Sequence, residues 1–437
     1  MALMLVIADD LTGAADCGVA CASHGLHTLL VLGDSGDDVD SEALANAEAL
    51  SVDGDTRRLP SNEAAAETTR LLRRYARDEE TLIYKKLDST MRGNVGAELA
   101  AMLEARRRLT GGGERIVAVL APAFPATGRT TVAGRQLVHG KLLEESELCR
   151  EGDLLARSDI GGLLRAARLR PALLGLEQIR GEGEMLRDAM RMMAQEADVL
   201  VCDAETDDDL RRIAVASMAL GFGTVWAGSG GLARHLLPAA GLPRTLPSSH
   251  KPIQVSGPAL FVVGSGSAVA HEQVEVLASR SDTIVMKVSA EVLLAGEQSP
   301  KWLAHVRELE NALIASRDIA VFPDQKVRLN SSQGPLLTAA LAAMVRPLAD
   351  RVGALAVTGG ETARAVFEAW GVRELRLIGE VEAGLPFSVT AEWNREIPVL
   401  TKAGGFGGAE SLLRCLEFLK DLDRGMAVDN ARSKGSQ

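Results

Sequence analysis

Short apolar runs alternate with longer amphipathic stretches along most of this chain, and this alternation restricts the fold more than any other feature. Leu3–Ala8 and Val199–Cys202 are continuous apolar runs, whereas Ser61–Arg77 and Val95–Leu109 carry apolar residues at helical spacing. Strands buried on both faces that alternate with helices are typical of a mainly parallel sheet covered by helices. The sequence therefore predicts an α/β fold.

A proline-rich segment divides the alternation into two series. Five prolines fall between Pro238 and Pro258, and proline continues neither a helix nor an inner strand. A chain of 437 residues is also long for one hydrophobic core. We therefore predict a domain at 1–237, a linker at 238–258, a second domain at 259–420 and a polar tail at 421–437.

Further predicted strands lie in both series. Those of the first are Thr28–Leu32, Thr81–Tyr84, Ile116–Leu120 and Thr224–Ala227. Those of the second are Ala259–Val263, Thr283–Lys287, Ile319–Phe322, Ala354–Val357, Leu375–Ile378 and Pro398–Lys402. Each domain is thus expected to have its own sheet.

Composition narrows the choice of partners. The net charge of −11 argues against nucleic acid as the main partner, since phosphate backbones require a basic face. Five scattered cysteines without a CxxC pair, and the lack of a basic start, indicate a cytoplasmic protein. Residues 213–233 carry no charge, but five glycines interrupt them, so no membrane span is expected.

Two charged segments follow predicted strands. Residues 85–93 read KKLDSTMRG, a cluster that suits a small anion better than it suits packing. Asp9 and Asp10 follow the first strand, at the sheet edge where open α/β sheets bind ligands. Either Asp10 or Thr12 is expected to cap the next helix, and two adjacent carboxylates exceed what a cap requires.

Three segments share the order strand, Gly/Ser turn and helix, at 224–235, 260–272 and 355–365. Such a turn directs backbone N–H groups and a helix N-terminus toward one spot, which favours an anion. The alternative to anion binding is a purely structural role, in which a tight turn requires glycine. Neither the P-loop pattern nor GxGxxG occurs, because Val269 stands where the third glycine would be.

Five motifs in register carry a resemblance. They are ADDLTG at 8–13, KKLDSTMRG at 85–93, PAFPATGRTT at 122–131, VTGGET at 357–362 and TKAGGFG at 401–407. Together they resemble the four-carbon acid sugar kinase family over residues 3–420. The resemblance implies an N-terminal sugar-acid domain that faces a C-terminal nucleotide domain, with the active site in the interdomain cleft.

The resemblance also implies an activity, which is ATP-dependent phosphorylation of the C4 hydroxyl of threonate, erythronate or an oxo-tetronate. Mg²⁺ is the expected second cofactor, and a homodimer is the assembly considered. Residue by residue, it assigns to the sugar acid Asp9, Arg57, Lys86, Asp88, Ser89, Arg92 and Arg129. It assigns to ATP Ser265, Ser267, Gly359, Gly360, Glu361, Thr362, Gly404 and Gly405.

Several roles stay open at this point. The residue that accepts the hydroxyl proton is either Asp9 or Asp88, with Asp10 as a fallback for binding. Arg58 lies next to Arg57, and Lys402 or Arg129 offsets charge on the γ-phosphoryl group. The Mg²⁺ ligands are unknown. Residues 145–159 depart from the family pattern, so the particular acid is not implied.

Two other functions compete with the kinase. A two-lobed sugar-acid sensor would bind the acid without turnover, but it has no use for a second lobe with phosphate-binding turns. An NAD(P)-dependent oxidoreductase is disfavoured because the dinucleotide fingerprint is absent.

Overall fold

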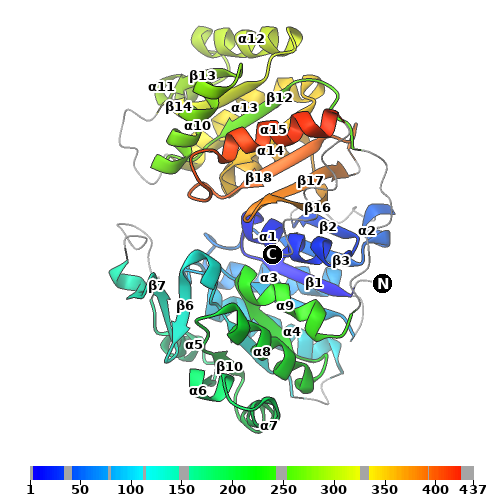
Figure 1. Cartoon of the computed structure of the whole chain (residues 1–437), viewed down its shortest axis with the longest axis vertical. Helices are drawn as coiled ribbons and strands as arrows, with labels where there is room; N and C mark the ends of the chain where they lie inside the picture. Colours follow the sequence, from blue (N-terminus) through cyan, green and yellow to red (C-terminus); the bar gives the residue numbers. More distant parts are fainter. Residues whose placement is uncertain are drawn as a thin grey trace. The chain divides into compact units, whose positions relative to one another are not determined.

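The computed structural model describes residues 3–33, 42–76, 80–111, 115–146, 157–242, 253–324, 334–391 and 393–424. The chain divides into two compact units, Met1–Leu246 and Pro247–Gln437 (Figure 1). The division falls within the proline-rich segment, of which residues 243–252 lie outside the described part. Residues 147–156, from the stretch that departs from the family, and 425–437, from the predicted tail, also lie outside it.

The first unit has a parallel sheet in the order β2-β3-β1-β4-β11-β5-β10-β9. Its strands are β1 (Met4–Ala8), β2 (Thr28–Leu32), β3 (Ala49–Asp53), β4 (Leu82–Lys86), β5 (Ala118–Ala121), β9 (Pro171–Leu174), β10 (Val199–Cys202) and β11 (Val225–Gly228). Its helices are α1 (Leu11–Ser23), α2 (Glu42–Asn46), α3 (Ser61–Tyr75), α4 (Val95–Leu109), α5 (Ile160–Ala166), α6 (Leu176–Ile179), α7 (Gly183–Ala194), α8 (Asp207–Ser217) and α9 (Gly230–Ala239). Helix α1 packs with α9, and α3 packs with α4.

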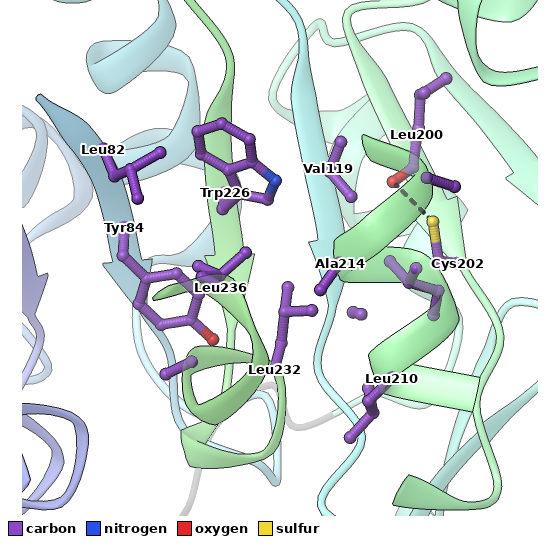
Figure 2. Packing of buried hydrophobic residues seen from close by; sticks show 14 of the residues in the cluster. Leu82, Tyr84, Val119, Leu200, Cys202, Leu210, Ala214, Trp226, Leu232 and Leu236 are labelled. Atoms are coloured by element: carbon purple, nitrogen blue, oxygen red, sulfur yellow. Dashed lines mark hydrogen bonds between the residues drawn. The ribbon is translucent and has the colours of Figure 1, made fainter. Parts of the chain in front are cut away.

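The core of this unit lies where helices cover the buried strands. Figure 2 shows Tyr84 from β4 and Trp226 from β11 beside leucines of α9, with Val119 of β5 farther along the sheet. Both aromatic side chains are fully buried, and their polar atoms have partners: the Tyr84 hydroxyl donates to the Ser229 carbonyl and the Trp226 indole N–H to Ser217 Oγ at 2.9 Å. Satisfying these groups lets large aromatics fill the core at little cost.

A small antiparallel sheet in the first unit was not predicted. It has the order β6-β7-β8, with β6 at Arg129–Val132, β7 at Arg135–Val138 and β8 at Lys141–Leu142. These strands are short and polar, so they lack the apolar run that marks the inner strands.

The second unit has the sheet order β13-β14-β12-β15-β18-β17-β16. Its strands are β12 (Ala259–Val263), β13 (Ile284–Ser289), β14 (Ile319–Asp324), β15 (Ala354–Thr358), β16 (Glu374–Glu382), β17 (Leu385–Ala391) and β18 (Pro398–Lys402). Its helices are α10 (Ala268–Arg280), α11 (Ala290–Ala295), α12 (Pro300–Ile314), α13 (Gly334–Val345), α14 (Gly360–Trp370) and α15 (Ser411–Asp423). Strands β16 and β17 form an antiparallel hairpin, and β17 also pairs with β18 in antiparallel orientation. The neighbouring strands from β13 to β18 pair in parallel.

Two helices extend past the boundaries expected from sequence. Helix α9 includes Pro238 in its last turn, and α15 continues to Asp423, into the segment expected to be tail. A proline so near a helix end removes a single main-chain hydrogen bond, so the helix tolerates it. The uncharged stretch at 213–233 is divided among α8, β11 and α9. Among the described residues, no helix combines the length and apolar character needed to cross a membrane.

Candidate active site

Polar side chains gather at one edge of the first unit's sheet. Ala8 is level with Asp53 of β3 and with Lys86 of β4, so the segments after these three strands begin side by side. The chain places β2 and β3 on one side of β1 and β4 on the other, so the strand order reverses between β1 and β4. Such a switch point is where open α/β sheets bind ligands.

Asp9, which is buried, and Arg57, which is partly exposed, form an ion pair at this edge. Arg57 Nε donates to Asp9 Oδ2 at 2.7 Å, and Arg57 Nη2 donates to Oδ1 at 3.0 Å. Burial opposes ionisation of Asp9, but Arg57, Lys86 and Lys85 together hold its pKa below the usual range. Asp9 is therefore an ionised carboxylate fixed in one orientation.

Asp10 has two structural partners. Its Oδ1 accepts the Gly13 N–H at 3.0 Å, so Asp10, not Thr12, caps helix α1. Its Oδ2 accepts from Arg57 Nη1 at 2.8 Å. The Arg57 guanidinium therefore bridges both aspartates, and the peptide that carries it is held by an N–H donated to the Asp9 carbonyl at 3.2 Å.

Asp88 and Arg92 make the second ion pair of the cluster. Arg92 Nε donates to Asp88 Oδ2 at 2.6 Å, and the Thr90 hydroxyl donates to the same oxygen. Burial opposes ionisation, while Arg57 and Arg92 keep the pKa of Asp88 well below its usual range. Between them Met91 is buried with φ at 56°, a left-handed conformation that is costly for this residue type.

Gly93 lies beside the first ion pair. It has φ at +89°, a left-handed conformation that favours glycine, whereas a Cβ there would make only ordinary van der Waals contacts, 3.4 Å from Arg57 Cγ and 3.5 Å from Asp9 Oδ2. Arg57 also lowers the pKa of Asp88, so Asp9, Arg57, Asp88 and Arg92 form one charged group.

The remaining predicted residues adjoin this group in different ways. Lys86 is buried, and its ammonium donates to the Leu87 carbonyl at 2.8 Å; burial disfavours the charge, but Asp9 and other neighbours leave its pKa raised. Ser89 is held through its carbonyl, which accepts from Gln136 Nε2 at 2.8 Å. Arg129 feels the charges of Asp88 and Arg92, and its buried Nε has no partner among the described residues.

A buried hydrogen-bond network, which the sequence did not reveal, holds the loop that carries Arg57 in place. Lys85 Nζ donates to Glu98 Oε1 at 2.9 Å, and the Thr56 hydroxyl donates to the same oxygen. Lys85 and Glu98 are 0% and 1% exposed. Asn94 donates its amide to the carbonyls of Thr56 and Leu59, at 3.1 and 2.8 Å. Helix α4 therefore fixes the loop that carries Arg57.

Asp16 is a second residue that the sequence analysis missed. It lies on α1, seven positions after Asp9, and burial raises its pKa while Lys86 and Arg234 oppose the shift. A Cβ on Gly230 would lie 2.3 Å from its Oδ2, so the start of α9 approaches this carboxyl closely. Asp9 precedes helix α1, so no helical spacing relates the two residues and no sequence pattern marks Asp16.

The glycine turns of the second unit also meet at a switch point. Strands β13 and β14 lie on one side of β12, and β15 lies on the other. Val263 is level with Thr358, and Thr358 is level with Lys402, so the turns after β12, β15 and β18 begin side by side. This arrangement brings together the three segments predicted to bind nucleotide.

Close approach explains several of these glycines. A Cβ on Gly264 would lie 1.9 Å from Thr362 Oγ1, and one on Gly404 would lie 2.2 Å from Ser265 Oγ. Gly359 has φ at +102°. Thr362 is buried, whereas Glu361 is exposed in the first turn of α14 beside Gly360. In contrast, a Cβ on Gly405 would meet no atom within 4 Å.

The serines tie two of the turns together. Ser267 caps helix α10 by accepting the Ala270 N–H at 3.1 Å, and its hydroxyl donates to the Gly404 carbonyl at 2.8 Å. Ser265 Oγ lies 3.2 Å from Ser267 Oγ. Within the described residues, no group of three or more His, Cys, Asp or Glu side chains could hold a metal ion.

Comparisons with known proteins agree with this division. A model of a sugar-binding N-terminal domain matches residues 4–236, and a model of a nucleotide-binding C-terminal domain matches residues 260–412. A D-threonate kinase from Cupriavidus necator is 38% identical over 416 residues, 93% of this chain and 96% of that protein. A 3-oxo-tetronate kinase from Methylobacterium radiotolerans is 30% identical over 435 residues, 94% of this chain and 98% of that protein.

Solved structures show the same fold. A Haemophilus influenzae protein is 22% identical with a TM-score of 0.71, covering 95% of this chain and 100% of that one. A Salmonella typhimurium protein is 21% identical with a TM-score of 0.75, covering 94% and 98%. The predicted two-domain α/β fold, with mainly parallel strands covered by helices, is confirmed.

Proposed function

Since this chain belongs to the four-carbon acid sugar kinase family, we propose that it transfers the γ-phosphoryl group of ATP to the C4 hydroxyl of a four-carbon sugar acid. The main support for the proposal is that the chain has a charged site suited to a sugar acid and a separate glycine-rich site suited to a nucleotide. One unit has an ionised, arginine-bound Asp9 at its switch point, and the other has three glycine turns at its own.

Arg57 acts in this proposal as a positioning residue for Asp9. Its guanidinium donates along both edges to Asp9 and Asp10, so a substrate carboxylate would have to displace one of them. Arg129 is better suited to the C1 carboxylate, because its buried Nε lacks a described partner and a planar guanidinium matches a carboxylate. This role differs from the anchor expected for Arg57 from the family resemblance.

Asp9 is the residue we assign to the acceptor hydroxyl. Phosphoryl transfer depends on positioning and charge neutralisation more than on a strong base. An ionised carboxylate held by Arg57 can accept a hydrogen bond from the C4 hydroxyl and take its proton as the bond to phosphorus forms. Asp88 serves less well, because Thr90 and Arg92 both donate to its Oδ2.

The second unit is proposed to hold ATP. The space beside Gly405 and the close packing of Gly264 and Gly404 let the backbone approach a phosphate or ribose, which a side chain at these positions would prevent. Mg²⁺, bound through phosphate oxygens, would supply positive charge at the transferred group. The protein's own contribution is to orient the phosphates and to exclude water.

The test is ADP release from Mg·ATP with D-threonate, L-threonate, D-erythronate, L-erythronate and the oxo-tetronates as acceptors. We expect rapid turnover with one acid and choose D-threonate as the first to be assayed, because the relative at 38% identity bears that name. Binding of an acid without ADP release would instead favour a sensor. Failure of ATP and of every acid to bind would contradict the proposal.

A further inference from the structure

The glycine loop of the second unit, residues 403–408, is tied to the protein through its carbonyl oxygens. Lys402 Nζ donates to the carbonyls of Ala403 and Phe406, each at 2.9 Å. The Lys402 side chain belongs to β18 and the residue is only 4% exposed. Its ammonium therefore points back into the loop that follows it.

Gln273 holds the same loop from helix α10. Its Nε2 donates to the Phe406 carbonyl at 3.1 Å and to the Gly408 carbonyl at 2.9 Å. Gln273 is fully buried, and it shares the Phe406 carbonyl with Lys402. With the Ser267 bond to Gly404, side chains thus fix four of the loop's carbonyls.

Most backbone N–H groups of the loop, unlike its carbonyls, have no hydrogen-bond partner among the described residues. Phe406 N–H closes a turn to the Ala403 carbonyl at 3.1 Å. The N–H groups of Gly404, Gly405, Gly407 and Gly408 have no acceptor within the part of the chain that is described. A loop whose carbonyls are occupied and whose amides are available suits an anion, since successive N–H groups make a site for phosphate.

We propose that Lys402 and Gln273 are positioning residues, which hold the carbonyls of the glycine loop so that its amides bind the phosphates of the nucleotide. Lys402 does not contact the transferred phosphoryl group. This inference rests on the proposed nucleotide site, and it replaces the expectation that Lys402 offsets charge on the γ-phosphoryl group. The charge on that group is left to the metal.

The experiment compares Lys402→Met, Gln273→Leu and the double variant with the exposed-lysine control Lys301→Met. Mg·ADP affinity is measured by calorimetry, and KM for ATP and kcat by ADP release. We expect each single variant to weaken ADP binding about tenfold, because a carbonyl loses its donor. The double variant should weaken it by more than the product of the two, since each side chain still holds the Phe406 carbonyl when the other is removed. The control should match wild type.

Two results would overturn the inference alone. One is an unchanged ADP affinity in Gln273→Leu together with a loss of more than a hundredfold in kcat at saturating ATP in Lys402→Met, which would indicate direct contact with the transferred group. The other is unchanged amide exchange of residues 403–408 in Lys402→Met, where faster exchange is expected. That second measurement decides the matter if Gln273→Leu does not fold.

This experiment distinguishes failure of the positioning roles from failure of the proposed kinase function. ADP binding requires no acceptor, so an error in the choice of sugar acid leaves the comparison intact. Wild-type protein that binds neither ADP nor ATP would overturn both the nucleotide site and the positioning roles. Wild-type binding with equal affinity in all variants would overturn only the positioning roles.

Discussion

The two units have their candidate sites at the same topological position, but one site consists of charged side chains and the other mainly of backbone groups. In both sheets the first strand has two later strands on one side and the next strand on the other, and polar groups follow the strands at that reversal. In the first unit these groups are charged side chains in ion pairs whose carboxylates are buried and whose arginines are partly exposed. In the second they are glycines, hydroxyls and main-chain amides.

The difference teaches how each site is kept in shape. Charged side chains need partners, so the first site depends on a second layer that includes Lys85 and Glu98. Backbone groups need a fixed loop, so the second depends on donors such as Lys402 and Gln273 that occupy its carbonyls. Mutations should therefore affect the two sites in different ways.

The largest effect is expected from Asp9→Asn. The asparagine keeps the shape but loses the charge that balances Arg57 and accepts the proton, so kcat should fall by about 10³-fold. ATP affinity should stay within about twofold of wild type. The measurement is ADP release with the best acid, alongside calorimetric titration with an ATP analogue. Loss of nucleotide binding would instead move Asp9 to the nucleotide site.

The buried scaffold of the first site gives the next effect. Glu98→Gln leaves the Lys85 ammonium, which is 0% exposed, without its charged partner, so the free energy of unfolding should fall by about 3 kcal/mol. Glu104→Gln on the same helix breaks only exposed pairs with Arg107 and Arg108 and should cost about 0.5 kcal/mol or less. Urea unfolding of both variants makes the comparison. Equal losses would show that burial does not govern this pair.

A pH effect is expected in the second unit. Burial lowers the pKa of Lys402 to about 8, against the opposing influence of Cys415 and Glu382. Two groups lie near it: burial raises the pKa of Cys415 to about 12, and Glu382 pairs with Arg414 at 2.7 Å. Between pH 8 and the unfolded value of 10.5, only the unfolded chain keeps the Lys402 proton.

Wild type should therefore gain stability relative to Lys402→Met as the pH rises from 8 to 10, by about 2 kcal/mol. Below pH 8 both states hold the proton, so the difference should be constant. Urea unfolding of the two proteins at several pH values measures this difference. A gap that does not change between pH 8 and 10 would show that the Lys402 pKa is not lowered.

The smallest effect separates two neighbouring glycines. Gly405→Val adds atoms where no protein atom lies within 4 Å, so the melting temperature should be unchanged while KM for ATP rises about tenfold. Gly404→Ala meets Ser265 Oγ at 2.2 Å and should lower the melting temperature as well. KM for the sugar acid should not change in either. A rise in the sugar-acid KM alone would contradict the assignment of the units.

The sequence predicts strands that are apolar runs well, and it predicts hairpin strands and strands that contain proline less well. Strands β2, β10, β12 and β18 match their predicted ranges residue for residue. The first three are almost entirely apolar, as expected of strands buried on both faces. Strand β17 was missed, although its partner β16 was found in part, and β9, which carries Pro171 at the sheet edge, was missed too. Edge and hairpin strands lack that signal, so pattern alone does not reveal them.

The candidate site shows a similar limit. Motifs located Asp9, Asp88 and the glycine turns, since these follow apolar strands directly. They did not reveal that Arg57 is occupied by two aspartates, or that Gln273 reaches Phe406 across 133 residues of sequence. Such contacts depend on which helix covers which strand end, and no local pattern records that.

The most direct test is amide hydrogen exchange of the full-length chain with each ligand alone. D-threonate should slow exchange at residues 85–93 and in the loop that carries Arg57, and leave the glycine turns unchanged. A non-hydrolysable ATP analogue with Mg²⁺ should slow exchange at residues 264–267, 359–362 and 403–408. The opposite pattern, with the nucleotide protecting residues 85–93 and the acid protecting the glycine turns, would contradict the division of labour between the two units.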